Sequence, residues 1–398
     1  MLKINKIASS ISPSLTLAIT SKAAALKAEG KNIISFGAGE PDFDTPEYIR
    51  DSAIEAINKG ITKYTAASGT KELKEAICKK LLEDNSLSYT PENIIISNGA
   101  KHSLYNIFAV LLEEGDEVIV PSPFWLSYPE MVKMANGTPV MVETSAKNSF
   151  KITADEFEKA VTSKTKAIVI NSPNNPTGSV YTYDELKAIG EVAVKYNIAI
   201  ISDEIYEKII YDGMNHVSIA SISPEIKELT FVVNGMSKAY AMTGWRIGYV
   251  AGPAYVIKAM SAMQSHATSN PNSIAQYASC AALGGDKASM EHMRATFEAR
   301  RDLMVKEINA SDMISCEKPH GAFYVLVDIS KLIGKSVDGR VIESSLDCAD
   351  ILLDKALVAT IPGIVFGLND YIRLSYAVSN EHITEGLARI RAFAESLK

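Results

Sequence analysis

Short runs of hydrophobic residues alternate with amphipathic stretches over most of the first 250 residues of the chain. There are seven such runs, and most of them are nearly continuous in apolar residues, which is typical of strands that are covered on both faces. They lie at 93–97, 117–120, 140–143, 167–171, 198–202, 230–234 and 248–251. Between them, apolar residues recur with helical spacing, as over 104–111. This alternation predicts an α/β fold with a mainly parallel central sheet flanked by helices.

The last hundred residues follow a different pattern. A long, charged helix is predicted over 287–308, and strand-like runs and two further helices, near 346–356 and at 380–396, follow it. This order predicts a smaller α+β domain. The first 48 residues are too few to fold alone, so we expect them to pack onto it. The predicted large domain is therefore 49–290, and the small domain combines 1–48 with 291–398.

The composition is that of an ordinary folded protein, with 47% hydrophobic and 22% charged residues among 398. A net charge of −7, without a basic stripe, argues against a nucleic-acid partner. No apolar run reaches the roughly 18 residues that span a bilayer, and we identify no signal peptide. The four cysteines form no CxxC pair and the six histidines have no ligand spacing. We therefore expect a cytoplasmic protein without a metal site.

Polar, glycine and aromatic residues follow directly after five of the predicted strands. In an open, mainly parallel sheet, ligands bind beyond the carboxyl ends of the strands. The segments in these positions are 98–101, 122–125, 174–178, 203–206 and 235–238. We expect them to converge at one edge of the sheet and to form the functional site.

Two residues in these segments suit chemistry on a ring that carries an aldehyde. Lys238 is flanked by small, aromatic and apolar residues, and desolvation there would lower the pKa of its amine and make it nucleophilic toward an aldehyde. Asp203 ends a strand, where a carboxylate can keep a ring nitrogen protonated and turn a pyridinium into an electron sink. Taken alone, Lys238 also fits a surface lysine and Asp203 a helix N-cap.

Several residues near a predicted helix start favour an anionic ligand. Gly99 and Ala100 open a helix whose free N–H groups and dipole suit a phosphate. Lys101 lies in the first turn, where a cation is unfavourable unless an anion lies nearby. Ser237 and Arg246 can donate hydrogen bonds to the same phosphate. The alternative for Lys101 is an exposed lysine that tolerates a small electrostatic cost.

Four more residues offer ligand contacts. Arg373 is presented from a predicted strand, where its rigid fork can clamp a carboxylate. Asn175 and Tyr206 can hydrogen-bond a phenolic oxygen, and Trp125 can stack on a planar ring. In isolation, each also fits an ordinary structural role, such as a solvent-facing arginine, a turn residue or a packing tryptophan.

Taken together, the motifs resemble one protein family over essentially the whole chain. The chain resembles the class I aminotransferases among the fold-type I pyridoxal 5′-phosphate (PLP) enzymes, and its pattern is most similar to that of the bacterial-type aspartate aminotransferases. The matching segments are GAGEPDFDTP at 37–46, KYTAASGTKELKEAI at 63–77, SPFWLSYPEM at 122–131, NSPNNPTG at 171–178, SDEIYE at 202–207, SKAYAMTGWRIGY at 237–249 and YIRLSYA at 371–377. The resemblance implies the PLP fold, PLP as cofactor and a homodimer with shared active sites.

The resemblance also implies a role for each cofactor-binding residue. Lys238 would bind PLP covalently and later shuttle a proton, and Asp203 would pair with the pyridinium nitrogen. Asn175 and Tyr206 would contact the ring oxygen O3′, and Trp125 would cover the ring. The phosphate contacts would come from Ser237, Arg246, the amides of Gly99 and Ala100, and Tyr64 from across the dimer interface.

For the substrate, the resemblance implies that Arg373 binds the α-carboxylate beside Gly39. Lys101 and Thr16 would serve the distal carboxylate in place of a second arginine. The full substrate-binding set is then Thr16, Gly39, Lys101, Trp125, Asn175 and Arg373. Family members also carry cis peptide bonds where this chain has Ser122–Pro123 and Asn175–Pro176.

The implied reaction is the ping-pong conversion of L-aspartate and 2-oxoglutarate to oxaloacetate and L-glutamate. The first alternative is a prephenate or aromatic amino-acid aminotransferase on the same scaffold. A more distant alternative is a non-catalytic binding protein that retains the PLP fold. The complete set of reactive residues argues against the latter.

Overall fold

A seven-stranded sheet forms the middle of the larger part of the molecule. In the computed structural model, which describes residues 2–13 and 15–397, the strand order is β2-β8-β7-β6-β5-β3-β4. Neighbouring pairs from β7 to β4 are parallel, whereas β8 is antiparallel to both of its neighbours. The strands are β2 (Ile94–Ser97), β3 (Glu117–Ser122), β4 (Thr138–Glu143), β5 (Thr165–Asn171), β6 (Ala199–Asp203), β7 (Thr230–Gly235) and β8 (Gly248–Ala251). The mainly parallel sheet predicted from the sequence is confirmed.

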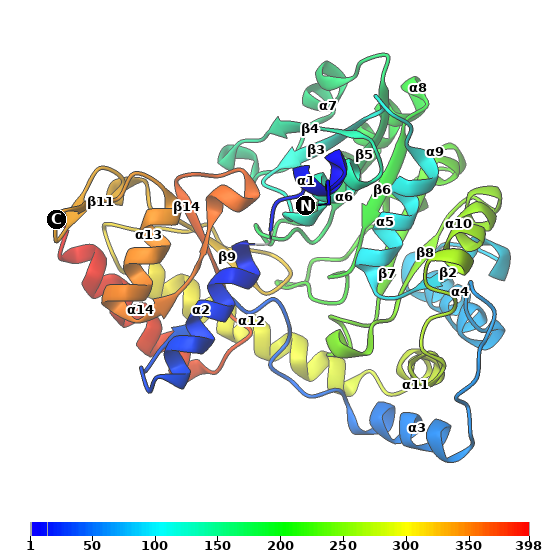
Figure 1. Cartoon of the computed structure of the whole chain (residues 1–398), viewed down its shortest axis with the longest axis horizontal. Coiled ribbons are helices and arrows are strands. Elements are labelled where there is room, and N and C mark those ends of the chain that lie inside the picture. Colours follow the sequence, from blue (N-terminus) through cyan, green and yellow to red (C-terminus); the bar gives the residue numbers. More distant parts are fainter. Residues whose placement is uncertain (1, 14, 398) are drawn as a thin grey trace.

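Helices cover both faces of this sheet (Figure 1). One face packs against α5 (Ala100–Leu111), α6 (Ser127–Met134) and α10 (Ala254–Ala267). The other face packs against α3 (Glu47–Asn58), α4 (Lys71–Asn85), α7 (Ala154–Ala160), α8 (Tyr183–Tyr196), α9 (Pro224–Leu229) and α11 (Ser273–Gly284).

The two faces of one strand illustrate why the strands are continuous in apolar residues. On β3, Val118 and Val120 pack on the side of α5, whereas Ile119 packs on the side of α8. Successive side chains of a strand point to opposite faces, so burial of both faces requires apolar residues at every position. Within residues 2–13 and 15–397, no helix combines the length and apolar character that crossing a membrane requires.

A smaller α+β part lies beside the sheet, at the left of Figure 1. Its core is an antiparallel sheet in the order β13-β14-β9, packed against the long α12 and the C-terminal α14. β1 pairs in parallel with β12 and so joins the N-terminal segment to this part. The elements are β9 (Tyr324–Asp328), β13 (Ile361–Pro362), β14 (Tyr371–Ser375), β1 (Ile34–Ser35), β12 (Val358–Ala359), α12 (Ala288–Ile308), α13 (Ser345–Ile351) and α14 (Asn380–Glu395).

The predicted smaller α+β part is therefore present, while the domain boundaries near residues 49 and 290 stay a prediction. The N-terminal helices α1 (Lys6–Ser10) and α2 (Leu15–Ala28) precede β1, and a two-stranded ribbon of β10 (Ser336–Val337) and β11 (Arg340–Val341) projects from the smaller part. In Figure 1, α1 lies beside α6, above the junction between the two parts.

The direction of the strands brings the five predicted segments to one edge. β3, β5, β6 and β7 run parallel, and β2 has the same direction because it is antiparallel to β8, which is antiparallel to β7. Cis peptide bonds occur at Ser122–Pro123 and Asn175–Pro176, as the resemblance implied, and also at Ser172–Pro173, which was not predicted.

Candidate active site

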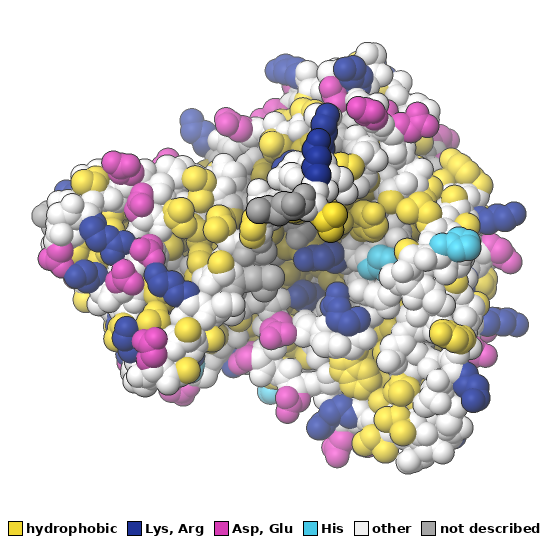
Figure 2. All heavy atoms as spheres, in the orientation of Figure 1, with side chains coloured by type: hydrophobic (Ala, Val, Ile, Leu, Met, Phe, Trp, Pro, Cys, Tyr) yellow, Lys and Arg dark blue, Asp and Glu magenta, His cyan; other side chains and the backbone are white. Residues whose placement is uncertain are grey.

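A cleft of about 380 Å³ opens at this edge of the sheet. Figure 2 shows Lys and Arg side chains in the hollow at the middle of the displayed face. The cleft brings together residues from all five post-strand segments, from the N-terminal segment and from the smaller part. The predicted residues in its lining are Thr16, Gly39, Ala100, Lys101, Trp125, Asn175, Asp203, Tyr206, Ser237, Lys238, Arg246 and Arg373.

Lys238 follows β7 and extends its amine into the cleft. Its Nζ donates a 2.5 Å hydrogen bond to the carbonyl oxygen of Gly39 and lies 5.9 Å and 5.7 Å from the ring centres of Tyr206 and Phe323. Burial lowers the pKa of Lys238 to about 8, although Glu40 nearby favours the charged form. A sizeable fraction of such an amine is neutral near physiological pH, so it can act as a nucleophile.

Asp203 ends β6 as a carboxylate that is only 3% exposed. Its Oδ2 accepts a 2.6 Å hydrogen bond from the Tyr128 hydroxyl, and its Oδ1 accepts a 3.2 Å bond from the Ile205 N–H. Burial raises the pKa of Asp203 to about 6, against the effect of these two bonds. Among the described residues, no cationic side chain forms an ion pair with it. A buried acid of this kind suits a cationic group on a ligand.

Arg373 enters the cleft from β14 and is 3% exposed. Its guanidinium donates a 3.0 Å hydrogen bond to Asn175 Oδ1 and lies 4.3 Å and 5.1 Å from the ring centres of Tyr324 and Phe366. Burial lowers the pKa of Arg373, and its Nε is buried without a partner. An unpaired buried donor costs free energy, which a bound carboxylate would recover.

The start of α5 provides a site for an anion. No side chain caps this helix and no acidic residue lies in its first turn. The Arg246 guanidinium lies beside it and donates to the carbonyls of Thr243 at 2.8 Å and Asn98 at 3.3 Å. A Cβ at Gly248 would lie 2.2 Å from the Ala100 nitrogen, so this close packing requires glycine. Uncapped N–H groups next to a guanidinium bind phosphate groups well.

Two predicted residues lie outside the cleft lining. Gly99 uses its N–H to donate to the Ser97 carbonyl at 2.8 Å, so this amide already has an acceptor within the protein. Its positive φ of 87° suits glycine, and a Cβ there would lie 2.4 Å from the Arg246 guanidinium. Gly99 therefore makes room for Arg246. Tyr64 is 90% exposed, and its contact with a partner's phosphate stays a prediction.

Lys101 and Thr16 add two polar groups to the cleft. The Lys101 ammonium lies 4.8 Å from the centre of the Trp125 ring, and desolvation and the Arg246 charge lower its pKa. Among the described residues, no carboxylate pairs with Lys101. The Thr16 hydroxyl is buried without a hydrogen-bond partner. Both groups are available to an anionic ligand.

Sequence similarity to known proteins shows which family the chain belongs to. The family model described as "Aminotransferase class I and II" matches residues 31–390. The chain belongs to this family. Among its relatives, the aspartate aminotransferase of Geobacillus stearothermophilus is 49% identical over 395 residues, covering 99% of this chain and 100% of the relative. The aspartate/prephenate aminotransferase of Nitrosomonas europaea is 48% identical and covers 98% of this chain and 99% of its own length.

Solved structures agree with this membership. The crystal structure of the aspartate aminotransferase from Rhizobium meliloti matches with a TM-score of 0.97 at 43% identity, and the match covers 100% of both chains. The family resemblance, the PLP fold type and the expectation of an enzyme are therefore confirmed for this aminotransferase. The roles of its individual cleft residues stay predictions.

Two tyrosines of the aminotransferase cleft were missed by sequence reasoning. Tyr128 contacts Asp203 through its hydroxyl, and its ring meets the Trp125 ring edge-on at 5.3 Å. The Tyr324 hydroxyl lies 3.1 Å from that of Tyr206. Tyr128 belongs to the quoted motif at 122–131 and Tyr324 to an apolar strand. Neither position reveals where the hydroxyl points until the fold brings its partner close.

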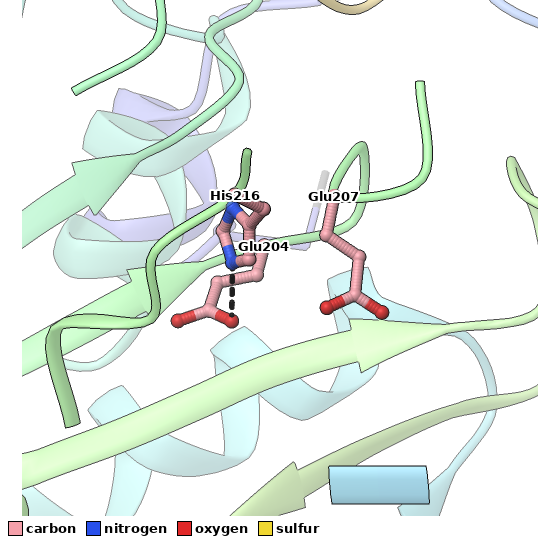
Figure 3. Close-up of side chains that lie close together, drawn as sticks. All are labelled: Glu204, Glu207 and His216. Atoms are coloured by element: carbon pink, nitrogen blue, oxygen red, sulfur yellow. Dashed lines mark hydrogen bonds and ion pairs between the residues drawn. The ribbon is translucent and has the colours of Figure 1, made fainter. Parts of the chain in front are cut away.

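A second cluster of titratable groups includes two residues of the 203–207 segment and lies outside the cleft lining. Ligand-type atoms of Glu204, Glu207 and His216 lie within 4.8 Å of one another (Figure 3). His216 Nε2 is 2.9 Å from Glu204, which also accepts from two serine hydroxyls. Glu207 pairs with the Lys80 ammonium and accepts from Asn85 at 3.0 Å. Although burial opposes it, Lys80 lowers the pKa of Glu207 to about 2. The protein itself thus partners both carboxylates, and the cluster anchors this segment.

Proposed function

We propose that this aminotransferase is an aspartate aminotransferase that converts L-aspartate and 2-oxoglutarate to oxaloacetate and L-glutamate, with PLP as its cofactor. The observation that carries this proposal is that Arg373 and Lys101 line the same cleft as the Lys238 amine. Arg373 and Lys101 are cations additional to Arg246 at the anion site, and two such cations suit a substrate with two carboxylates. The names of the two cited relatives, which both include aspartate, support the same substrate class.

The donor set of the cleft fits PLP at three points. The Lys238 amine, with its lowered pKa, suits an aldehyde. The buried Asp203 carboxylate suits a protonated ring nitrogen. The uncapped start of α5 beside Arg246 suits the phosphate, where the Ala100 amide and the Ser237 hydroxyl would add donors. Because the Gly99 amide already donates to Ser97, we assign it no phosphate contact.

The protein residues then divide the work of transamination. When bound, PLP supplies an aldehyde for the substrate amine and a protonated ring that withdraws electrons from the α-carbon. Asp203 keeps the ring nitrogen protonated. Lys238 Nζ accepts the proton that leaves the substrate α-carbon and returns it in the later half of the transfer. Since Asn175 Oδ1 already accepts from Arg373, the Asn175 amide nitrogen is the donor left for the ring oxygen, beside the Tyr206 hydroxyl.

Substrate orientation would come from opposite charges. Arg373 would bind the α-carboxylate through its fork, which satisfies the unpaired Nε. Lys101 and the Thr16 hydroxyl would bind the distal carboxylate. Trp125 would cover the ring face and also hold Lys101 through the cation–π contact.

A panel of amino donors and acceptors tests this proposal. We expect kcat/KM for aspartate with 2-oxoglutarate to exceed that for phenylalanine or alanine. Lys101→Ala should reduce kcat/KM for aspartate by roughly 10- to 100-fold, the value of a hydrogen bond to a charged group, with much less effect on alanine. A poor rate with aspartate would contradict the proposed specificity, and equal losses for both donors would remove Lys101 from the distal site.

Prephenate is the second candidate acceptor, because the Nitrosomonas europaea relative is named an aspartate/prephenate aminotransferase. Prephenate is also a 2-oxo acid with two carboxylates, so the same cations would serve it. The ratio of kcat/KM for prephenate to that for 2-oxoglutarate, with aspartate as donor, separates the two candidates.

We also propose that the enzyme is a cytoplasmic homodimer. Ile54 and Ile57 of α3 and Tyr64 after it are exposed, which suits a surface that a second copy covers. Cys78, Cys280, Cys316 and Cys348 are free thiols, in keeping with a reducing compartment. Sedimentation equilibrium tests the dimer, and Tyr64→Phe should weaken PLP binding only if Tyr64 reaches a partner's site.

A further inference from the structure

Tyr128 is a buried tyrosine that joins two residues of the proposed cofactor site. It lies in α6 and is 2% exposed. Its hydroxyl donates a 2.6 Å hydrogen bond to Asp203 Oδ2. Its ring meets the Trp125 ring edge-on, with 5.3 Å between ring centres and 83° between planes. One side chain thus contacts both the acid proposed for the ring nitrogen and the ring proposed for the cofactor face.

The hydrogen bond to Asp203 has a fixed direction. Burial and the Asp203 charge raise the pKa of Tyr128 well above the ordinary tyrosine value, so the phenol keeps its proton and remains the donor. A hydrogen bond to a carboxylate is stronger than one to a carboxylic acid, and so it favours the ionised form of Asp203. This effect opposes burial, which favours the neutral form.

We propose that Tyr128 is a positioning residue that keeps Asp203 ionised and directed at the ring nitrogen of PLP. This inference rests on the proposed function, because it requires PLP to bind in the cleft. Tyr128 acts through Asp203 and needs no contact with the substrate.

Besides the Tyr128 hydroxyl, a few other groups act on the Asp203 carboxylate. The other oxygen, Oδ1, already accepts from the Ile205 N–H at 3.2 Å. The remaining titratable groups that act on Asp203 are Glu204, Lys238 and Tyr206. Glu204 opposes its ionisation and Lys238 favours it. Tyr128→Phe leaves these groups in place, so its effect reports the hydroxyl alone.

The test measures PLP affinity of the cofactor-free protein by tryptophan fluorescence, from about pH 6 to about pH 9. Tyr128→Phe retains the ring and its contact with Trp125. We expect PLP to bind at least about tenfold more weakly, with the acid limb of the binding curve moved to higher pH. The control Tyr181→Phe removes another buried tyrosine hydroxyl, which accepts a hydrogen bond from the Ile152 N–H away from this cleft. It should leave the PLP affinity and the pH of the acid limb unchanged.

A double-mutant cycle and a fluorinated tyrosine sharpen the result. In an Asp203→Asn background, Tyr128→Phe should have little further effect, because the carboxylate through which it acts is absent. Fluorotyrosine at position 128 keeps the residue's size and makes the phenol a stronger donor. It should move the acid limb to lower pH, and this measurement does not depend on the folding of Tyr128→Phe.

The outcomes separate this inference from the proposed function. Equal affinity and pH dependence in the wild type and Tyr128→Phe would overturn the role of Tyr128 alone. A pH-independent loss of affinity that Tyr181→Phe reproduces would also overturn it. If the wild-type protein bound no PLP, the proposed function itself would be wrong.

Discussion

The Arg373 guanidinium donates a 3.0 Å hydrogen bond to the side-chain oxygen of Asn175, 198 residues earlier in the chain. This bond connects β14 of the smaller part with the loop after β5 of the central sheet. It links the residue proposed to bind the substrate carboxylate with the residue proposed to bind the ring oxygen. A substitution at Arg373 should therefore affect both substrate binding and the orientation of Asn175.

Arg373→Lys should lower kcat/KM for every amino donor by roughly 10- to 100-fold, because the lysine keeps the charge but loses the fork. The α-carboxylate is common to all donors, so aspartate and alanine should suffer alike. Rates of the half-reactions with both donors check this. A loss confined to aspartate would show that Arg373 binds the distal carboxylate instead.

Lys238→Ala should reduce turnover by at least about 100-fold, since it removes the amine that is proposed to accept the α-proton. The matched control is Lys258→Ala, which removes an exposed lysine of α10 and should leave turnover unchanged. Steady-state rates with aspartate and 2-oxoglutarate provide the measurement. Full activity in Lys238→Ala would exclude the proposed chemistry.

The reactivity of Lys238 toward small aldehydes should rise through about pH 8 in the cofactor-free protein, because burial lowers the pKa of its amine to that value. Below this pH the amine is protonated and unreactive. Exposed lysines should respond only near their ordinary pKa of about 10.4. Reductive labelling at several pH values, with peptide mapping by mass spectrometry, compares them. A midpoint for Lys238 equal to that of the exposed lysines would contradict this prediction.

The lowered pKa of Lys238 should also make the stability of the cofactor-free protein depend on pH. Between about pH 8 and about pH 10.5, Lys238 is protonated in the unfolded chain but neutral in the folded protein. In this range the contribution of Lys238 therefore increases the free energy of unfolding as the pH rises. Lys238→Met should abolish this gain. Urea unfolding of the two cofactor-free proteins at both pH values measures the difference, and parallel pH profiles would refute the prediction.

Lys80→Met should destabilise the protein by about 3–5 kcal/mol, because it leaves the Glu207 charge buried without its cation. Replacing both partners, in Lys80→Met with Glu207→Leu, should recover much of this loss. The control Lys187→Met breaks an exposed pair with Glu191 and should change the stability little. Urea unfolding measures all three variants, and an equal cost for Lys80→Met and Lys187→Met would show that the buried pair has no special weight.

Much of the fold could be predicted because its signals are local. All seven predicted strands of the central sheet are present, and the helix predicted over 287–308 is α12. Double burial makes a strand continuous in apolar residues. The residues after β2, β3, β5, β6 and β7 lie at one edge of the sheet because these five strands share one direction. Hence the segments containing Trp125, Asp203 and Lys238 could be assigned to one site before their partners were known.

Sequence by itself determined which segments become strands, and it predicted which edge of the sheet and which side chains are candidates for ligand binding and chemistry, since each signal depends on neighbours along the chain. Only the tertiary structure decided the position of β8 between β2 and β7. It also decided two hydrogen bonds, from the Tyr128 hydroxyl to the Asp203 carboxylate and from the Gly99 amide to the Ser97 carbonyl. A local pattern specifies which face of an element is buried, but hydrogen-bond partners depend on how distant elements pack, and that packing is a property of the whole chain.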